Sequence, residues 1–311
     1  MTRVLIIGAA GMLGGRLARA LGPAAEAMLL VDRSAPSIPD AAPTETEARA
    51  LDLAAPGAAG DLAAWAPDLV YHLAAVVSGQ AEADFDLGYR VNLDATRALL
   101  DALRPGDRRP RVVFSSSLAV YGPPFPAVVP DSFAPAPASS YGVQKLMGEH
   151  LVSDYSRKGF IDGVSLRLPT VVVRPGAPNA ATSGFMSAII REPLNGQRAT
   201  VPVSRDLAVW IASPDVTVAS LVRAATMDTG VARVLSARGI SVTIAEMVAA
   251  LGRIAGPDVA ALVEDGADPA AARVVETWPS AYACAAARAQ GFPVDDGIEA
   301  IIRQHIAQEH G

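Results

Sequence analysis

Short apolar runs alternate with longer alanine- and leucine-rich stretches through the first half of this chain. The apolar runs predict strands at residues 3–7, 28–31, 69–73, 111–115 and 163–168, and stretches of helical pattern lie between several of them. Strands that are apolar throughout and separated by helices are typical of a parallel sheet covered on both faces. We therefore expect an α/β fold built on a doubly wound parallel sheet of the Rossmann type.

The alternation breaks down beyond about residue 170 and partly resumes over 208–235. Helical patterns then follow at 243–254 and 298–308. An interrupted pattern of this kind predicts a smaller, discontinuous C-terminal cap that binds the substrate. We expect the dinucleotide-binding domain to take residues 1–169 and about 206–240, and the cap to take about 170–205 and 241–311.

The first predicted strand runs directly into a glycine-rich turn, which opens a helix expected over 12–21. Its glycines let a pyrophosphate approach the backbone, and the helix N-terminus supplies N–H groups for the anion. Asp32 ends the second strand, where a carboxylate accepts hydrogen bonds from the adenosine ribose and repels a 2′-phosphate. The pattern predicts NAD as the cofactor, although Arg33 beside Asp32 leaves NADP open. The turn residues expected to hold the cofactor are Gly8, Gly11, Met12, Leu13 and Gly14.

A tyrosine and a lysine stand four residues apart in a chain that otherwise uses arginine as its cation. Lys145 and Lys158 are the only two lysines among 26 basic residues, and Lys145 follows Tyr141 at helical spacing. Residues i and i+4 share a helix face, so the ammonium lies near the phenol and favours its ionised form. Moving a phenol from its pKa of about 10 toward ~7 takes about 4 kcal/mol. The pair predicts a tyrosine base that removes a proton from an alcohol.

Composition sets outer limits on function. With a net charge of −6 and scattered arginines, the sequence argues against a nucleic-acid-binding surface. Its four histidines and single cysteine show no clustered ligand spacing, which argues against a metal site and an internal disulfide. The apolar run at 1–7 is too short for a signal peptide, and no window approaches a membrane span. We expect a cytoplasmic protein that binds neither nucleic acid nor membrane.

Four further motifs, taken with the turn and the Tyr-x-x-x-Lys spacing, resemble those of the extended short-chain dehydrogenases/reductases, the NAD-dependent epimerase/dehydratase family. Residues 52–53 resemble the pair that contacts adenine, and residues 72–75 resemble the turn beside the adenosine. Asn92 resembles the asparagine of the active-site helix. The serines of 115–117 resemble the serine-bearing end of a strand, with Ser117 standing 24 residues before Tyr141. The resemblance covers nearly the whole chain.

The resemblance implies a role for each residue of the site. Tyr141 takes the hydroxyl proton, Ser117 holds the same oxygen, and Lys145 lowers the tyrosine pKa while gripping the nicotinamide ribose. Asn92 is expected to position Lys145, whereas we interpret His72 as a packed strand-end residue rather than a base. To the cofactor-binding turn and Asp32 the resemblance adds Asp52, Leu53, Leu73, Ala74, Ala75, Asn92, Tyr141, Lys145 and Pro169.

Within the family, the segments 75–80, 167–179 and 190–194 look like those of the bacterial D-erythronate dehydrogenases. The Asn-x-x-Gly-Pro pattern usual in sugar-nucleotide epimerases is missing, and Leu118 and Ala119 occupy the positions of the dehydratases' Asp-Glu pair. We expect NAD-dependent oxidation of the C2 hydroxyl of a short sugar acid. An NAD-dependent nucleotide-sugar epimerase stays open as the alternative, and a non-catalytic NAD-sensing protein on the same fold is a more distant one.

A small acid requires a cation for its carboxylate, and the planar fork of arginine matches a carboxylate with two parallel hydrogen bonds. Arg174 is the first candidate and Arg191 the second. The helical stretches 94–103 and 141–155 resemble those that form the dimer interface in this family, so a homodimer is expected. The residues expected to contact the substrate are Ser78, Ser116, Ser117, Tyr141, Thr170, Arg174 and Asn179.

Overall fold

Seven parallel strands form the central sheet of the computed structural model, which describes residues 2–106, 108–176, 182–266 and 268–309. Their spatial order is β10-β6-β5-β4-β1-β2-β3. This order places the crossover at β1 and β4, where a doubly wound fold opens its binding crevice. The strands are β1 (Arg3–Ile7), β2 (Ala27–Asp32), β3 (Glu45–Ala50), β4 (Leu69–His72), β5 (Arg111–Ser117), β6 (Asp162–Leu168) and β10 (Val234–Ser236).

The five strands predicted from apolar runs are all present, and the sheet is parallel throughout. The prediction missed both edge strands of the sheet, β10 beside β6 and β3 beside β2. Of the two, β3 is the longer. Its sequence Glu-Thr-Glu-Ala-Arg-Ala is polar because an edge strand is held by backbone hydrogen bonds on one side, and charged side chains protect its free edge. A search for apolar runs therefore passes over it.

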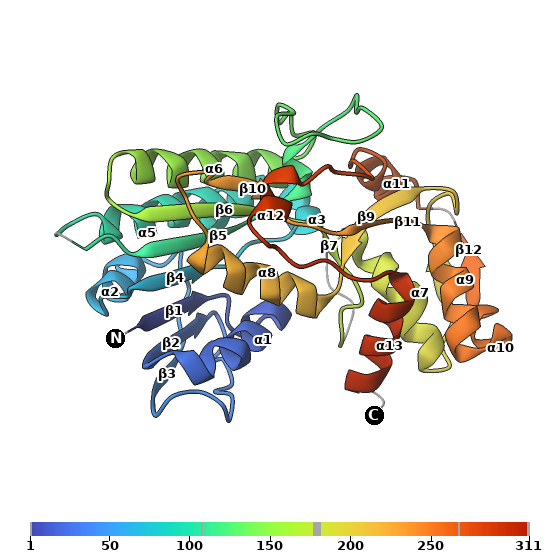
Figure 1. Cartoon of the computed structure of the whole chain (residues 1–311), viewed down its shortest axis with the longest axis horizontal. Coiled ribbons are helices and arrows are strands. Elements are labelled where there is room, and N and C mark those ends of the chain that lie inside the picture. The colour runs from blue at the N-terminus through green and yellow to red at the C-terminus, as the bar shows by residue number, and fades with distance from the viewer. Residues whose placement is uncertain (1, 107, 177–181, 267, 310–311) are drawn as a thin grey trace.

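Helices cover both faces of the sheet, as Figure 1 shows. Along β1, Val4 and Ile6 pack toward α1 (Met12–Leu21) and α8 (Pro214–Thr226). Leu5 and Ile7 pack on the opposite face, against α2 (Ala58–Ala64), α5 (Ala95–Leu103) and α6 (Ser140–Arg157). Successive side chains of a strand point to opposite faces, so a strand buried on both is apolar at every position. The doubly wound α/β prediction is confirmed.

A smaller part of the molecule, at the right in Figure 1, has its own apolar cluster. It contains the sheet β11-β9-β7 and the pair β12-β8. The predicted helix at 243–254 is α9, which begins with a capping box between Thr243 and Glu246. The elements are β7 (Thr170–Val171), β8 (Ala199–Val201), β9 (Ala208–Ala212), β11 (Ile240–Thr243), β12 (Val263–Asp265), α7 (Phe185–Leu194), α9 (Ile244–Ala255), α10 (Pro257–Ala260), α11 (Pro269–Val275) and α13 (Ile298–Glu309).

The chain crosses between the two parts several times. Within the predicted return at 206–240, β9 pairs with β7 and β11 in the smaller sheet, whereas α8 and β10 pack on the central one. Later, α12 (Ala285–Ala289) packs against the central part, because Ala287 belongs to the cluster of β1 and α1. The division into a dinucleotide domain and a cap stays a prediction. Among the described residues, no helix is both long and apolar enough to cross a bilayer.

Candidate active site

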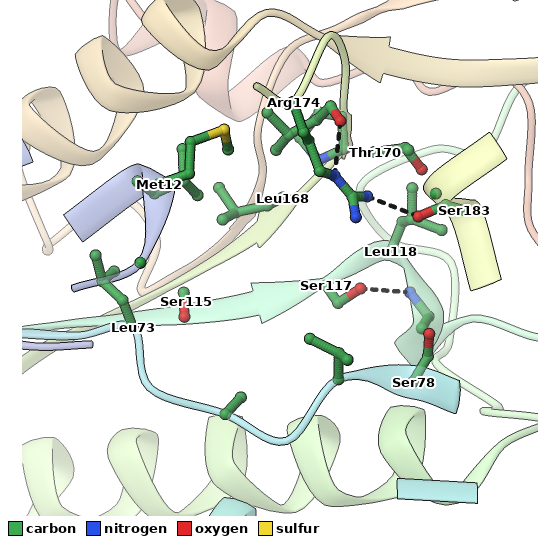
Figure 2. A pocket seen from close by; sticks show the side chains of 18 of the residues that line it. Met12, Leu73, Ser78, Ser115, Ser117, Leu118, Leu168, Thr170, Arg174 and Ser183 are labelled. Atoms are coloured by element: carbon green, nitrogen blue, oxygen red, sulfur yellow. Dashed lines mark hydrogen bonds between the residues drawn. The ribbon is translucent and has the colours of Figure 1, made fainter. Parts of the chain in front are cut away.

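A pocket of about 340 Å³ opens at the carboxyl ends of the central strands, where the smaller part of the molecule meets the sheet. Its walls come from the turn after β1, the ends of β4 and β5, the start of α6, and the segment from β6 to α7. Figure 2 shows Arg174 and Ser117 projecting into it from opposite sides. Of the described residues that line it, none is acidic, whereas Lys145, Arg174 and Arg191 are basic. The pocket therefore favours an anionic ligand.

The glycine-rich turn forms one end of this pocket through Gly8, Gly11 and Gly14. Gly8 has φ +95°, and a Cβ there would lie 2.7 Å from the backbone nitrogen of Ala74. A Cβ at Gly14 would collide with the carbonyl oxygen of Gly8. Only glycine fits these two positions, so the turn brings bare backbone to the start of α1, the arrangement that holds a pyrophosphate. Met12 and Leu13 line the same end.

The two predicted adenosine-side carboxylates lie beyond the turn. Asp32, at the end of β2, accepts a hydrogen bond from the Ala10 N–H at 3.1 Å and one from the Arg33 N–H. Its carboxylate is thus held beside the turn, where a ribose would lie. Asp52 accepts a hydrogen bond from the Ala54 N–H, and Leu53 is buried against the sheet. Bare backbone at the pyrophosphate position, followed by a carboxylate, fits a dinucleotide.

The end of β5, which carries three consecutive serines, contacts α6. The Ser117 side chain lies close enough to Tyr141 for a hydrogen bond to lower the tyrosine pKa, and its hydroxyl accepts a hydrogen bond from the Ala119 N–H at 3.2 Å. The Lys145 ammonium donates to the carbonyl of Ser115 at 2.8 Å and lies 5.7 Å from the ring centre of Tyr141. The structure therefore brings the predicted serine, tyrosine and lysine together at one wall of the pocket.

Burial and nearby charges shift the pKa values of Tyr141 and Lys145 in opposite directions. Burial raises the pKa of Tyr141 to about 12, against the lowering effects of the Ser117 hydrogen bond and the Arg174 charge. Burial lowers the pKa of Lys145 to about 7, against the raising effect of Glu149. A phenolate at Tyr141 consequently depends on positive charge from neighbouring groups, which Arg174 supplies in addition to Lys145.

Asn92 lies in a single π-helical turn (Arg90–Asp94) and is fully buried. Its Oδ1 accepts a hydrogen bond from the Val76 N–H at 2.7 Å, and its Nδ2 donates to the Val76 carbonyl and to Gln144 Oε1. These bonds fix the turn between β4 and α3 (Ser78–Ala83), which carries Ser78 into the pocket. A link from Asn92 to Lys145 stays a prediction.

Contacts within the smaller part hold Arg174 in place. Its Nε donates to the Val171 carbonyl at 3.0 Å, one Nη donates to Ser183 at 2.7 Å, and its backbone N–H donates to Ser187. The second candidate, Arg191, donates to the carbonyl of Arg174 at 2.7 Å and forms an ion pair with Glu192. Arg174 thus presents its guanidinium to the pocket, while Arg191 supports the backbone that carries it.

The remaining predicted substrate residues have different surroundings. Ser78 and Thr170 line the pocket, as does the predicted cofactor residue Pro169. Ser116 also lines it, but its hydroxyl donates to Glu149 at 2.5 Å. Asn179 lies outside the described residues.

His72 agrees with its interpretation as a packed residue. Its Nε2 shares a hydrogen bond with Thr96 at 2.8 Å, and burial followed by the Lys145 charge lowers its pKa to about 3. A ring that stays neutral over the ordinary pH range makes a poor base for this chemistry.

Sequence reasoning missed several residues of the pocket and its surroundings. Ser183, Ser187 and Trp278 line it, and no local motif marks them, because the fold brings them in from distant segments. Glu149 could have been recognised, since it repeats the Tyr141–Lys145 spacing once more along α6.

The model of the NAD dependent epimerase/dehydratase family matches residues 4–233. A D-erythronate dehydrogenase of Cupriavidus necator is 47% identical over 317 residues, covering 97% of each chain. A D-erythronate dehydrogenase of Haemophilus influenzae is 39% identical and covers 98% of each. A crystal structure from Agrobacterium tumefaciens, described as a nucleoside-diphosphate-sugar epimerase, matches with a TM-score of 0.95 at 44% identity, covering 100% of this chain and 95% of its own.

Proposed function

This chain belongs to the NAD-dependent epimerase/dehydratase family, with NAD as its cofactor, and we propose that it oxidises the C2 hydroxyl of a short sugar acid to the 2-oxo acid. D-erythronate or a close aldonate is the substrate. The observation that carries this proposal is the position of Arg174, whose guanidinium faces the pocket that holds the Ser117–Tyr141 pair. A carboxylate bound there leaves the adjacent hydroxyl next to Tyr141.

Each residue of the wall contributes one function to this reaction. Tyr141 accepts the proton of the C2 hydroxyl, and Ser117 donates a hydrogen bond to the same oxygen. Lys145 stabilises the phenolate and holds the nicotinamide ribose, while the turn from Gly8 to Gly14 and Asp32 hold the rest of the dinucleotide. A bound NAD⁺ would supply the acceptor for the hydride that leaves C2. Ser78 and Thr170 line the pocket, and in this proposal they bind the remaining hydroxyls.

A nucleotide-sugar epimerase is the second candidate, favoured by the description of the Agrobacterium structure. Such an enzyme also oxidises its substrate with a tyrosine and NAD, but it returns the hydride and releases no NADH. The two functions therefore differ in net cofactor reduction.

The test offers the purified protein NAD⁺ or NADP⁺ with four- to six-carbon aldonates and, separately, with nucleotide sugars, and follows NADH by absorbance. We expect sustained NADH formation with a four-carbon aldonate and a preference for NAD⁺. Interconversion of a nucleotide sugar without net NADH, together with no reaction of any aldonate, would make the protein an epimerase.

A further inference from the structure

A buried carboxylate lies one helical turn beyond Lys145. Tyr141, Lys145 and Glu149 follow each other at intervals of four in α6 and so lie along one side of the helix. Glu149 is 2% exposed. Its Oε1 accepts hydrogen bonds from the Ser116 hydroxyl at 2.5 Å and from Arg167 Nε at 2.8 Å, and its Oε2 accepts one from an Arg167 Nη at 2.7 Å.

These contacts continue the pairing between β5 and α6 that forms the active site. The backbone carbonyl of Ser115 accepts from Lys145, the Ser116 hydroxyl donates to Glu149, and the Ser117 side chain lies next to Tyr141. Ser116 lies opposite Arg167 in the register of β5 and β6, so the carboxylate joins three elements at one point. Because a shift of one residue would turn every side chain of β5 to the other face, this connection fixes Ser117 toward the pocket.

From this arrangement we propose that Glu149 is a positioning residue of the active site, which holds the end of β5 against α6 and supplies the negative charge that keeps Lys145 an ammonium. Without a counter-charge, burial favours the neutral amine of a lysine. The bidentate Arg167 pair is 10% and 3% exposed, so solvent screens it little, and the guanidinium lies directly against the carboxylate.

The charged and titratable groups around Lys145 come from every neighbouring element. Tyr141 and Glu149 are on α6, His72 is on β4, Arg167 is on β6, and Arg174 acts on Tyr141 from the smaller part. His72 stays neutral because its pKa is lowered to about 3. Among these groups, Glu149 supplies the negative charge that raises the pKa of Lys145 against the lowering effect of burial.

The presence of two lysines makes a direct test possible. Protein labelled with ¹³C at lysine Cε gives two signals, and Lys158→Arg identifies that of Lys145. Glu149→Gln keeps the shape and an acceptor for Ser116 but removes the charge. We expect the Lys145 titration midpoint to fall by about one pH unit in this variant. Because this readout needs no substrate, its failure is distinct from failure of the proposed function.

Three further variants are expected either to shift the Lys145 titration midpoint in the opposite direction or to leave it unchanged. Arg167→Met removes the positive partner and should raise the Lys145 midpoint, and Glu149→Asp keeps the charge and should leave it near the wild-type value. Asp162→Asn breaks the ion pair with Arg233 at the other end of β6 and should leave the midpoint unchanged. An unmoved midpoint in folded Glu149→Gln would overturn the proposal. If that variant does not fold, an unmoved midpoint in Arg167→Met overturns it instead.

Discussion

Two ionisable side chains on α6, the partly exposed Tyr141 and the buried Lys145, determine what chemistry the pocket supports. Their identity and spacing could be read from the sequence, because a lysine four residues after a tyrosine stands out in a chain with two lysines. The balance of effects that sets the pKa values of Tyr141 and Lys145 could not be predicted from the sequence. It depends on the burial of both groups and on Arg174 and Glu149, whose distances from them are set by the fold.

Replacing Tyr141 with Phe tests the proposed base. Without the hydroxyl no group at this position can take the substrate proton, so we expect kcat to fall by about 10²- to 10⁴-fold. NAD binding, followed by fluorescence titration, should persist because the ring remains. Tyr155→Phe is the matched control, since Tyr155 lies on the same helix and donates to Asp101 away from the pocket. Near-normal turnover by the Tyr141 variant would refute the assignment.

Replacing Arg174 with Lys tests the carboxylate site. The lysine keeps the charge but loses the planar fork, so the KM for the aldonate should rise by about tenfold or more while the KM for NAD⁺ stays unchanged. Arg205→Lys serves as the control, because Arg205 pairs with Asp265 on the smaller part. Equal KM values for the acid in the Arg174 variant and the wild type would exclude this residue as the clamp.

At the level of elements, apolar pattern identified the strands that are buried on both faces and failed where that condition does not hold. The edge strand β3 is polar, and the two-residue strand β7 is too short to show a period. Likewise, the turn between β4 and α3 is held by Asn92 and Gln144, whose contacts span 16 and 52 residues. Neither local propensity nor spacing carries that information.

His72, buried at the end of β4, makes the stability of the folded protein depend on pH in the acid range. Its folded pKa of about 3 lies below the ordinary value of 6.5, so between these values the unfolded chain binds a proton that the folded one does not. Stability therefore falls as the pH drops below 6.5, by about 2 kcal/mol at pH 5 from this group. Urea unfolding at pH 7 and pH 5 should show a smaller loss in His72→Gln than in the wild type. An equal loss in both proteins would contradict the prediction.

At the level of the whole molecule, the pocket depends on the junction of two apolar clusters. Trp278 packs against both of them and also lines the pocket. Its place could not be predicted, because it lies more than 130 residues after Tyr141 and carries no motif. Local sequence patterns thus predict the central sheet and the cofactor-binding turn, whereas the substrate side of the pocket is formed by segments distant in the sequence.

The homodimer expected from family resemblance stays a prediction, and two exposed apolar side chains favour it. Met147 on α6 is 40% exposed, and Phe85 on α4 (Phe85–Tyr89) is 58% exposed. Light scattering after size exclusion should give twice the chain mass of 32.0 kDa. Met147→Glu should shift the protein toward monomer, whereas Val231→Glu, at another exposed apolar position, should not. A wild-type mass of one chain would rule the dimer out.

The most direct test of the proposed reaction follows the hydrogen on C2. The enzyme is given NAD⁺ and D-erythronate that carries deuterium at C2, and the reduced cofactor is analysed by mass spectrometry. Transfer of the C2 hydride predicts one deuterium in each NADH formed, together with a slower rate than with unlabelled acid if chemistry limits turnover. Unlabelled NADH would place the oxidation at another carbon, and the absence of NADH would contradict the dehydrogenase itself.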